Sequence, residues 1–119
     1  MAVRRLDVAI VGGGAAGLFA AAILGRALKD RNVSIAIFEK GARVGRKLIS
    51  TGNGTCNITN TGCSVDRYHG AEPSFVKKAL DNFTPEMALE VFSSAGVECY
   101  TRDDGKVYPI CQQASSVLD

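Results

Sequence analysis

The start of the chain shows two short apolar runs separated by a longer helix-like segment. Residues 6–11 are mostly apolar and rich in β-branched side chains, which is typical of a fully buried strand. Residues 15–29 favour a helix, because alanine, leucine and isoleucine recur and the basic Arg26 and Lys29 suit its C-terminal end. Residues 33–39 repeat the strand pattern. Together these segments predict a strand–helix–strand unit of the βαβ type.

A polar segment at residues 40–62 interrupts this pattern. It contains five glycines and many Ser, Thr and Asn side chains, and its apolar positions show little periodicity. We therefore expect a long loop here. Loops of this length inside a compact domain are usually either functional or disordered.

Regular patterns return in the second half of the chain. Residues 74–83 have a helical pattern, and a second helix is predicted over residues 86–95. Thr84 before Pro85 is a typical helix start, since the hydroxyl can cap the first turn and proline suits the first helical position. Gly96 is placed to end this second helix.

The C-terminal part predicts a small hairpin. Residues 97–101 and 106–110 have strand composition, and the Asp-Asp-Gly sequence at 103–105 favours a turn between them. Residues 112–119 resemble the first turns of a helix. The chain as a whole therefore predicts an α/β fold, with a Rossmann-like βαβ unit, a long loop, helices and a β-hairpin.

Composition adds the class of protein. The 119 residues allow one domain, and 46% hydrophobic with 22% charged residues is ordinary for a soluble globular protein. The formal net charge of +2 gives no reason to expect a nucleic-acid partner. The four cysteines contain no C-x-x-C pair and there is one histidine, so a zinc site is not expected and reduced thiols in a cytoplasmic protein are favoured.

Residues 8–24 carry no charge, which raises the alternative of a secretory or membrane segment. The chain also begins with a basic stretch, as signal peptides do. Asp7 interrupts the junction, however, and three consecutive glycines at 12–14 lie where a signal peptide has its apolar core. The run is also short for a membrane span, which needs about 20 apolar residues. We therefore expect neither export nor a membrane partner.

The glycines of this apolar segment match the G-x-G-x-x-G pattern at Gly12, Gly14 and Gly17. The pattern follows a predicted strand and opens a predicted helix, which is the context that dinucleotide binding requires. Gly12 would make the tight turn, Gly14 would let a pyrophosphate approach the backbone, and Gly17 would let the helix pack closely. The N–H groups at the helix start would then face the phosphates.

Glu39 supports the same interpretation, because it ends the second predicted strand 22 residues after Gly17. A carboxylate at this place can accept both hydroxyls of an adenosine ribose, and it would repel a 2′-phosphate. The glycine motif does not distinguish FAD from NAD. Four basic residues follow within eight positions, and beside a pyrophosphate they suit anion binding, although such runs are often only solvated: Lys40, Arg43, Arg46 and Lys47.

Three stretches together resemble a known family: "VGGGAAGLFAA", "FEKGARVGRKLISTGNGTCNITN" and "DGKVYPICQQASSVLD". They are similar to the N-terminal part of bacterial NAD(P)/FAD-dependent oxidoreductases of the aminoacetone-oxidase-like group, which includes reductases of 3-dehydro bile acids. The second stretch is more specific than the glycine motif, since generic dinucleotide folds lack it. The resemblance implies non-covalent FAD as cofactor, with NAD(P)H as a candidate electron donor.

The resemblance also implies site residues. It assigns the ADP half of FAD to the helix start and to the end of the second strand, and the pyrophosphate and flavin side to the loop that follows. The cofactor-binding residues expected are Gly12, Gly14, Ala15, Ala16, Gly17, Glu39, Lys40, Arg46, Lys47, Ser50, Asn53, Gly54 and Cys56. The family often has arginine where this chain has Thr55, so no charge role is carried over to that position. No catalytic acid or base is assigned.

Three further residues have two interpretations each. Tyr108 and Pro109 resemble the family's aromatic–proline pair, which would shape the entrance near the flavin, or they are a plain strand end. Cys56 is a redox thiol or, as we prefer, a small buried residue, since no second cysteine follows at C-x-x-C spacing. His69 is best regarded as an incidental loop histidine.

The expected function is that of the FAD-binding part of an oxidoreductase that transfers hydride between a nicotinamide cofactor or small organic substrate and an acceptor. The rivals are an NAD-dependent dehydrogenase and a non-catalytic nucleotide-binding module. Because family members are several times longer, residues 1–119 are expected to be the N-terminal part of an incomplete domain, inactive alone. The oligomeric state and the substrate are not predicted.

Overall fold

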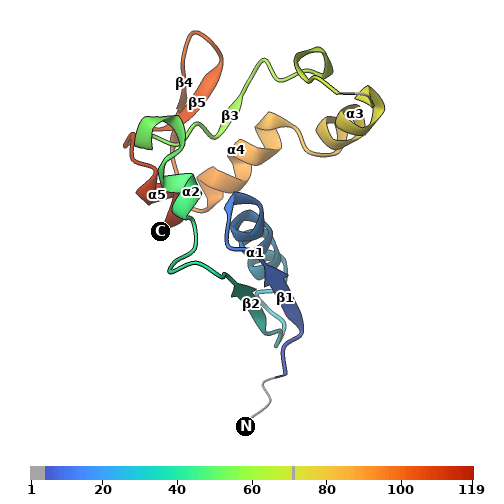
Figure 1. The fold of residues 1–119 in the computed structure, drawn as a ribbon, viewed down its shortest axis with the longest axis vertical. Helices are drawn as coiled ribbons and strands as arrows, with labels where there is room; N and C mark the ends of the chain where they lie inside the picture. Colours follow the sequence, from blue (N-terminus) through green and yellow to red (C-terminus); the bar gives the residue numbers. More distant parts are fainter. Residues whose placement is uncertain (1–4, 71) are drawn as a thin grey trace. The chain divides into compact units, whose positions relative to one another are not determined.

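A computed structural model describes residues 5–70 and 72–119 of the chain (Figure 1). The polypeptide forms two compact units, one up to Ile49 and one from Ser50 to Asp119, and each is described by itself. Within the part of the chain described, no helix is both long and apolar enough to cross a membrane.

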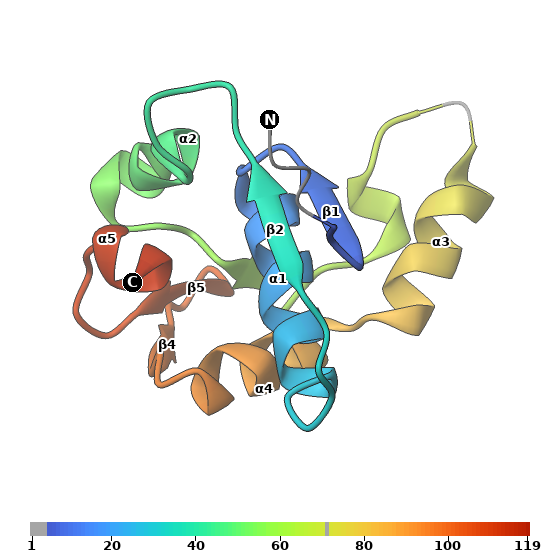
Figure 2. The same ribbon diagram turned by 90° about the horizontal axis from the view of Figure 1, so that it is seen from below.

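The N-terminal unit contains the predicted strand–helix–strand arrangement. Strand β1 (Val8–Val11) pairs in parallel with β2 (Ile35–Phe38), with Val8 opposite Ile35 and Val11 opposite Phe38. Helix α1 (Ala15–Ala27) connects the two strands and lies along this pair (Figure 2). The α/β class with a parallel sheet is therefore confirmed, although each element is shorter than its sequence pattern predicts.

Asp7 and Ser34, which directly precede the two strands, are hydrogen-bonded to each other. The backbone N–H and the hydroxyl of Ser34 donate to the Asp7 carboxylate at 2.8 and 2.7 Å, and the Asp7 N–H donates to the Ser34 hydroxyl at 3.1 Å. These bonds hold the pKa of the Asp7 carboxyl below its usual range, with the backbone bond from Ser34 as the main cause. The charge that separates the basic start from the apolar run is thus part of the sheet's hydrogen bonding.

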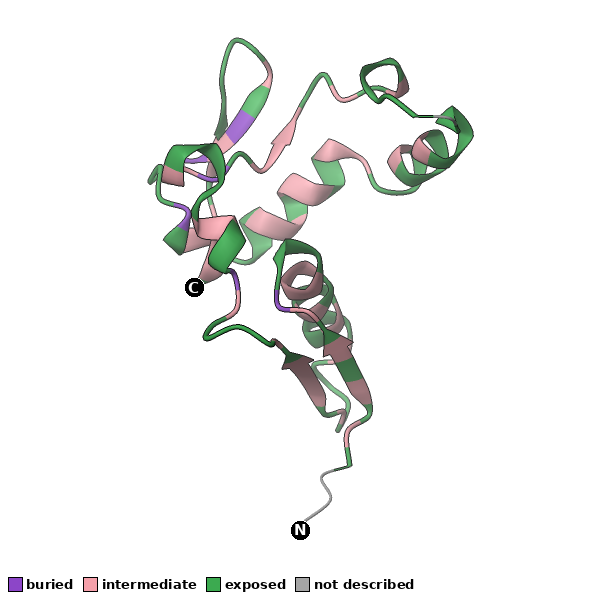
Figure 3. Ribbon diagram, in the orientation of Figure 1, coloured by how far each residue is buried: buried purple, intermediate pink, exposed green. Residues whose placement is uncertain are grey.

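The prediction that both strands are fully buried is wrong for the structure described. Val11 is 88% exposed and Phe38 is 53% exposed, and β1 alternates between half-buried and exposed positions (Figure 3). A parallel sheet buries both faces only when other elements cover both. Here the sheet has two strands, and α1, which itself contains no buried residue, packs against it.

The segment at residues 40–62 is more structured than the single long loop that we predicted. It contains a one-turn helix α2 (Arg46–Ile49), a 3₁₀ turn η1 (Thr51–Gly54) and a short strand β3 (Thr59–Asn60). Left-handed residues bend the chain inside η1, with φ of 54° at Gly52 and 53° at Asn53. Such short elements and left-handed turns leave no apolar periodicity in the sequence, which explains why the hydrophobic pattern did not reveal them.

The helices of the second unit match their sequence signals. A 3₁₀ turn η2 (Val65–Arg67) precedes α3 (Pro73–Asn82), and α4 (Pro85–Ser94) follows. The Thr84 hydroxyl accepts the Met87 N–H at 3.3 Å, which confirms the predicted N-cap. Gly96 follows the end of α4 with φ of 86°, a conformation that favours glycine.

A three-stranded antiparallel sheet forms the centre of the second unit. Strand β5 (Lys106–Pro109) lies between β3 and β4 (Cys99–Thr101), so the predicted hairpin is confirmed and β3 adds a third strand. The most buried side chains gather around it: Val107 is fully buried, and Pro109, Cys56 and Ala114 are almost so. Ala114 directly precedes the last helix, α5 (Ser115–Leu118).

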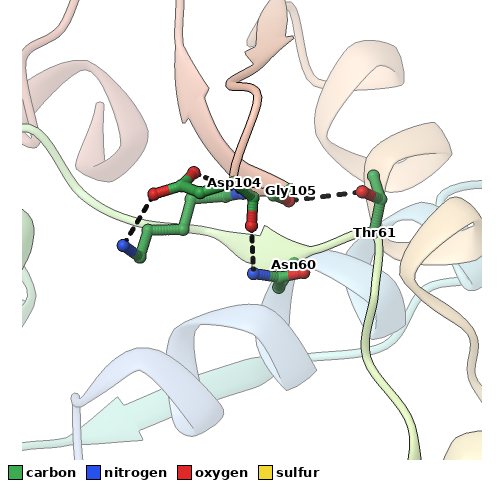
Figure 4. Close-up of polar contacts among 5 residues, drawn as sticks. Asn60, Thr61, Asp104 and Gly105 are labelled. Atoms are coloured by element: carbon green, nitrogen blue, oxygen red, sulfur yellow. Dashed lines mark hydrogen bonds and ion pairs between the residues drawn. The ribbon is translucent and has the colours of Figure 1, made fainter.

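The turn between β4 and β5 is fastened to the strand beside it. Gly105 has φ of 80°, and a Cβ there would lie 2.6 Å from the Asn60 Oδ1. The Asn60 amide donates to the Asp104 carbonyl at 3.3 Å, and the Thr61 hydroxyl donates to the Gly105 carbonyl at 3.4 Å (Figure 4). The predicted Asp-Asp-Gly turn therefore has a defined position on β3.

Candidate dinucleotide site and ligand cavity

The turn after β1 has the geometry that the glycine motif predicts. Gly12 has φ of 100°, and its N–H donates to the Phe38 carbonyl at 2.8 Å, so the turn starts where the parallel pair ends. A Cβ on Gly17 would lie 2.0 Å from the Gly12 carbonyl oxygen. No side chain can occupy that space, so glycine at position 17 is required for α1 to start this close to β1.

The start of α1 is open, and it is the part of the turn that could face a ligand. Gly14 is the N-cap residue and makes no side-chain cap, and a Cβ on it would meet no atom within 4 Å. Ala15 and Ala16 are exposed, and the first turn contains no acidic residue. The first N–H groups of a helix lack partners inside the helix and carry the positive end of its dipole, so they suit an anion here.

Gly13, which the motif treats as a spacer, has less space for a side chain than the motif residues Gly12 and Gly14. It is buried, and a Cβ on it would lie 2.5 Å from the Val44 Cγ1 and 3.2 Å from the Glu39 Cβ. Its N–H donates to the Glu39 carboxylate at 2.8 Å, and its carbonyl accepts the Gly45 N–H at 2.7 Å. Sequence reasoning missed this residue, because only the fold brings residues 39–45 back onto the turn.

Glu39 links the glycine turn to the backbone after β2. Its Oε2 accepts the Gly13 N–H, and its Oε1 accepts the Gly41 N–H at 2.7 Å. These two bonds, the one from Gly41 first, hold the pKa of the Glu39 carboxyl below its usual range. The group is therefore a carboxylate at neutral pH. Each oxygen can accept more than one hydrogen bond, so ribose hydroxyls can still be received.

The basic residues predicted for the pyrophosphate belong to the same unit. Lys40, Arg43, Arg46 and Lys47 are all exposed, and the last two open helix α2. Gly45, with φ of 67°, directs the chain into α2 while its N–H bonds to Gly13. The side chains thus follow a segment that is tied to the glycine turn, although Lys47 already takes part in an interaction within the protein.

The N-terminal unit therefore fits the ADP half of FAD. The free space at Gly14 and the N-cap without a side-chain bond are features that a backbone-bound pyrophosphate needs, whereas the close approach at Gly17 serves the packing of α1. Of the predicted residues, the structure brings Gly12, Gly17 and Glu39 together through Gly13.

The second unit contains a cavity of about 460 Å³. Two predicted residues, Ser50 and Asn53, line it, together with Gly52 and Thr55 of the same loop. The other wall comes from the hairpin and the segment after it, through Tyr100, Arg102, Tyr108 and Gln112. The volume lies within the range of about 300–1,000 Å³ that small-molecule sites occupy.

Two further predicted residues of the same loop, Gly54 and Cys56, take part in the packing of the second unit. Cys56 is 5% exposed, with φ of 59°, and does not line the cavity, which agrees with the preferred interpretation of a small buried residue. The Gly54 carbonyl accepts the Ala114 N–H at 2.7 Å. The thiols of all four cysteines are free, and His69 is an exposed loop residue.

Tyr108 lines the cavity, whereas its neighbour Pro109 is buried beneath it in the core. Gly52 has to be small here, since a Cβ on it would lie 3.3 Å from the Tyr108 ring and 2.9 Å from the Asn57 nitrogen. Tyr108 therefore lines an opening and Pro109 is a buried strand residue, and the position of this pair near a flavin stays a prediction.

Sequence reasoning missed Tyr100, Arg102 and Gln112. A signal existed for the first two, because residues two apart along a strand share a face and the turn sequence places Tyr100 opposite Tyr108. Gln112 has φ of 53°, which no feature of the sequence indicates. It reaches the cavity only because the chain turns back after β5.

The sequence matches one known protein family over almost its whole length. Residues 6–119 match the model described as the HI0933-like protein Rossmann domain. The chain belongs to this family. The match covers both units, and it confirms the resemblance to bacterial FAD-dependent oxidoreductases on which the sequence interpretation rested.

The chain is similar to curated proteins with two different activities in their names, a reductase and a ribosomal RNA dihydrouridine synthase. The chain is 38% identical over 112 residues, 94% of its length, to the 3-dehydro-bile acid delta(4,6)-reductase of Clostridium scindens. It is 34% identical over 83% of its length to the ribosomal RNA dihydrouridine synthase of Haemophilus influenzae, and 30% identical over 88% to that of Escherichia coli. The chain spans 27%, 24% and 25% of these proteins respectively, about a quarter of their length.

Proposed function

We propose that the chain is the FAD-binding part of a flavin-dependent oxidoreductase. The single observation that carries the proposal is the β1–α1 turn, where the N-cap at Gly14 is open and a Cβ at Gly17 would meet the Gly12 carbonyl at 2.0 Å. Membership of an HI0933-like Rossmann-domain family with reductase relatives supports the oxidoreductase assignment.

The chain's own residues have defined tasks in this proposal. The backbone N–H groups at the start of α1 bind the pyrophosphate, and the dipole of the 13-residue helix favours its charge. Glu39 accepts the hydroxyls of the adenosine ribose while the Gly13 and Gly41 amides hold its carboxylate ionised and oriented. Arg46 and Lys47 neutralise phosphate charge from the adjacent loop.

FAD, when bound, supplies the hydride-transfer chemistry, and the protein supplies position and electrostatics. We propose that the loop at Ser50, Asn53, Gly54 and Cys56 contributes its backbone to the flavin side, and that NAD(P)H is the electron donor. We further propose a small organic substrate and a cytoplasmic location. No residue of this chain is assigned a proton-transfer role.

The relatives named as ribosomal RNA dihydrouridine synthases favour a second candidate, in which the substrate is a nucleobase of ribosomal RNA. The formal net charge of +2 argues against it for this part of the protein, because RNA-binding surfaces are usually strongly basic. Retention of the protein on immobilised ribosomal RNA at physiological salt would favour the second candidate over the first.

The test of the proposal is a pair of identical substitutions in α1. Gly14→Val places a side chain where the pyrophosphate would lie, whereas Gly25→Val, also at a site with no atom within 4 Å, adds the same side chain far from the helix start. We expect Gly14→Val to weaken FAD binding at least about 100-fold and Gly25→Val to leave it within about threefold, measured by calorimetric titration.

Circular dichroism of both variants controls for folding. Glu39→Arg, which replaces the ribose acceptor by a donor of opposite charge, should also weaken binding. If the Gly14→Val protein is folded and binds FAD with the affinity of the parent, the proposed site is wrong. Tight binding of NAD by a protein that does not bind FAD would instead support the dehydrogenase alternative.

A further inference from the structure

The cavity of the second unit has a chemical character that differs from that of the dinucleotide turn. Its lining contains one cation, Arg102, and two phenol rings, Tyr100 and Tyr108. The remaining lining side chains are neutral hydroxyls and carboxamides, from Ser50, Thr55, Asn53 and Gln112. No carboxylate lines it, so the cavity offers one positive charge without an acidic partner in its wall.

Arg102 is held in place by the hairpin. Its N–H donates to the Lys106 carbonyl at 2.8 Å, and its carbonyl accepts the Gly105 N–H at 2.9 Å. The turn that follows is fastened to β3 through Asn60 and Thr61 (Figure 4). The guanidinium carbon lies 5.8 Å from the centre of the Tyr108 ring, on its face. The two hydrogen bonds fix the backbone of Arg102, and the ring contact gives its exposed side chain a preferred position.

Asp104, an acid of the hairpin turn, already pairs with a lysine of the same hairpin. Asp104 pairs with Lys106 at 2.8 Å, and it also accepts the Lys106 N–H at 3.1 Å. Among the described residues, Arg102 forms no ion pair within 4.0 Å. The Asp104 carboxylate interacts electrostatically with Arg102 but forms no ion pair with it, so the guanidinium N–H groups remain available to a ligand.

The aromatic wall adds a second requirement. The Tyr100 and Tyr108 rings lie 6.2 Å apart, inclined by 32°, and Tyr100 is 36% exposed. This spacing is that of two rings packed on each other, and the exposed part of such a pair can pack against a further flat, unsaturated group. A guanidinium fork matches a carboxylate in two parallel hydrogen bonds, and one guanidinium balances the single charge of a carboxylate but not that of a phosphate dianion.

We infer that this cavity is a binding site for a small carboxylate with a flat, unsaturated body, held by Arg102 and by the Tyr100–Tyr108 wall. Asn53 and Gln112 orient the remaining polar atoms of the ligand. Only the role of this site rests on the proposed function: in a flavin-dependent enzyme it would receive the substrate that is oxidised or reduced. Arg102 is thereby assigned as a specificity-determining residue.

The experiment uses benzoate as the probe, in calorimetric titrations of the purified protein. Benzamide is the neutral control of the same shape, and cyclohexanecarboxylate carries the charge without the flat ring. We expect benzoate to bind about tenfold more tightly than either, because each control lacks one of the two recognised features. The chain has no tryptophan and three tyrosines, so a change in tyrosine emission reports the cavity independently.

Variants test the residues. Arg102→Gln should lose at least about tenfold in benzoate affinity, and Arg102→Lys should lose less, because it keeps the charge without the fork. Arg67→Gln, at an exposed arginine in η2, is the matched control and should bind as the parent does. FAD affinity of Arg102→Gln, measured in the same way, should be unchanged.

The outcomes separate this inference from the proposed function. Absence of benzoate binding, or equal binding by Arg102→Gln and the parent, overturns the carboxylate site and says nothing against FAD binding at the β1–α1 turn. Competition between benzoate and FAD would show that the cavity receives the flavin itself, which overturns the inference and supports the proposed function. Benzoate binding without any FAD binding keeps the site and removes the proposed function.

Discussion

The two units of the chain use opposite ways of building a site. In the N-terminal unit the proposed binding surface is main chain, since Gly12, Gly14 and Gly17 offer no side chains and the start of α1 has no side-chain cap. In the second unit the cavity is formed by side chains of aromatic, cationic and amide residues around a sheet that holds the most buried residues. The first suits a ligand common to many proteins, and the second suits a particular one.

The difference extends to packing. Val11 and Phe38, at the end of the parallel pair, are largely exposed, while Val107 in the middle of the antiparallel sheet is fully buried. Stability of the described structure therefore depends on close backbone approach in the first unit and on apolar burial in the second. Three sets of substitutions test this contrast, and they are given in order of decreasing effect.

The largest effect is expected at the closest backbone approach. Gly17→Ala would place a methyl group 2.0 Å from the Gly12 carbonyl oxygen, and backbone cannot yield as a flexible side chain can. We expect a loss of about 3 kcal/mol in the free energy of unfolding, measured by urea denaturation with circular dichroism. Gly25→Ala, in the same helix with open space around it, should instead gain about 0.5–1 kcal/mol. Similar effects at both positions would contradict the proposed close approach.

A smaller loss is expected from the core of the second unit. Val107→Ala removes two methyl groups from a fully buried position, and we expect it to cost about 2 kcal/mol by the same measurement. Val11→Ala makes the same change at a position that is 88% exposed, and its effect should stay within about 0.5 kcal/mol. If Val11→Ala costs as much as Val107→Ala, burial does not distinguish the two units in the way described.

The smallest effects concern the caps of the two principal helices. Thr84→Ala removes the side-chain cap of α4 and should cost about 1 kcal/mol. Gly14→Ser adds such a cap to α1, where none exists, and should gain a few tenths of a kcal/mol, roughly the difference between these N-cap residues. The same Gly14→Ser variant should bind FAD more weakly than the parent. A variant that gains stability and keeps its FAD affinity would show that the open cap does not serve the ligand.

Local patterns predicted most of the elements, because their causes are local. The Thr84–Pro85 start, the left-handed Gly96 and the turn at Gly105 each depend on a few neighbouring residues. The same holds for the order strand, glycine turn, helix and strand that led to the dinucleotide interpretation. The strand ends and the extent of burial were predicted less well, since they depend on which elements cover the sheet.

The loop at residues 40–62 shows where local reasoning fails. Its glycines and polar residues indicated a loop, but Gly45 bonds back to Gly13, and the 3₁₀ turn at Thr51–Gly54 arises from left-handed residues that pattern analysis does not detect. Cys56 and Gln112 adopt positive φ although neither residue type suggests it. Both residues close local turns, since the Cys56 N–H donates to the Thr51 carbonyl at 3.1 Å and the Gln112 N–H donates to the Pro109 carbonyl at 2.9 Å.

By itself, the amino-acid sequence determined the class of fold, the glycine turn with Glu39 beside it, and the family, because these depend on short-range order and on the identity of a few residues. Only the tertiary structure decided that Gly13 has no space for a side chain beside Val44 and that Arg102, Tyr108 and Gln112 share one cavity. These groupings depend on strand register and on segments that return from elsewhere in the chain. Neither strand register nor the return of distant segments is determined by the local order of residues.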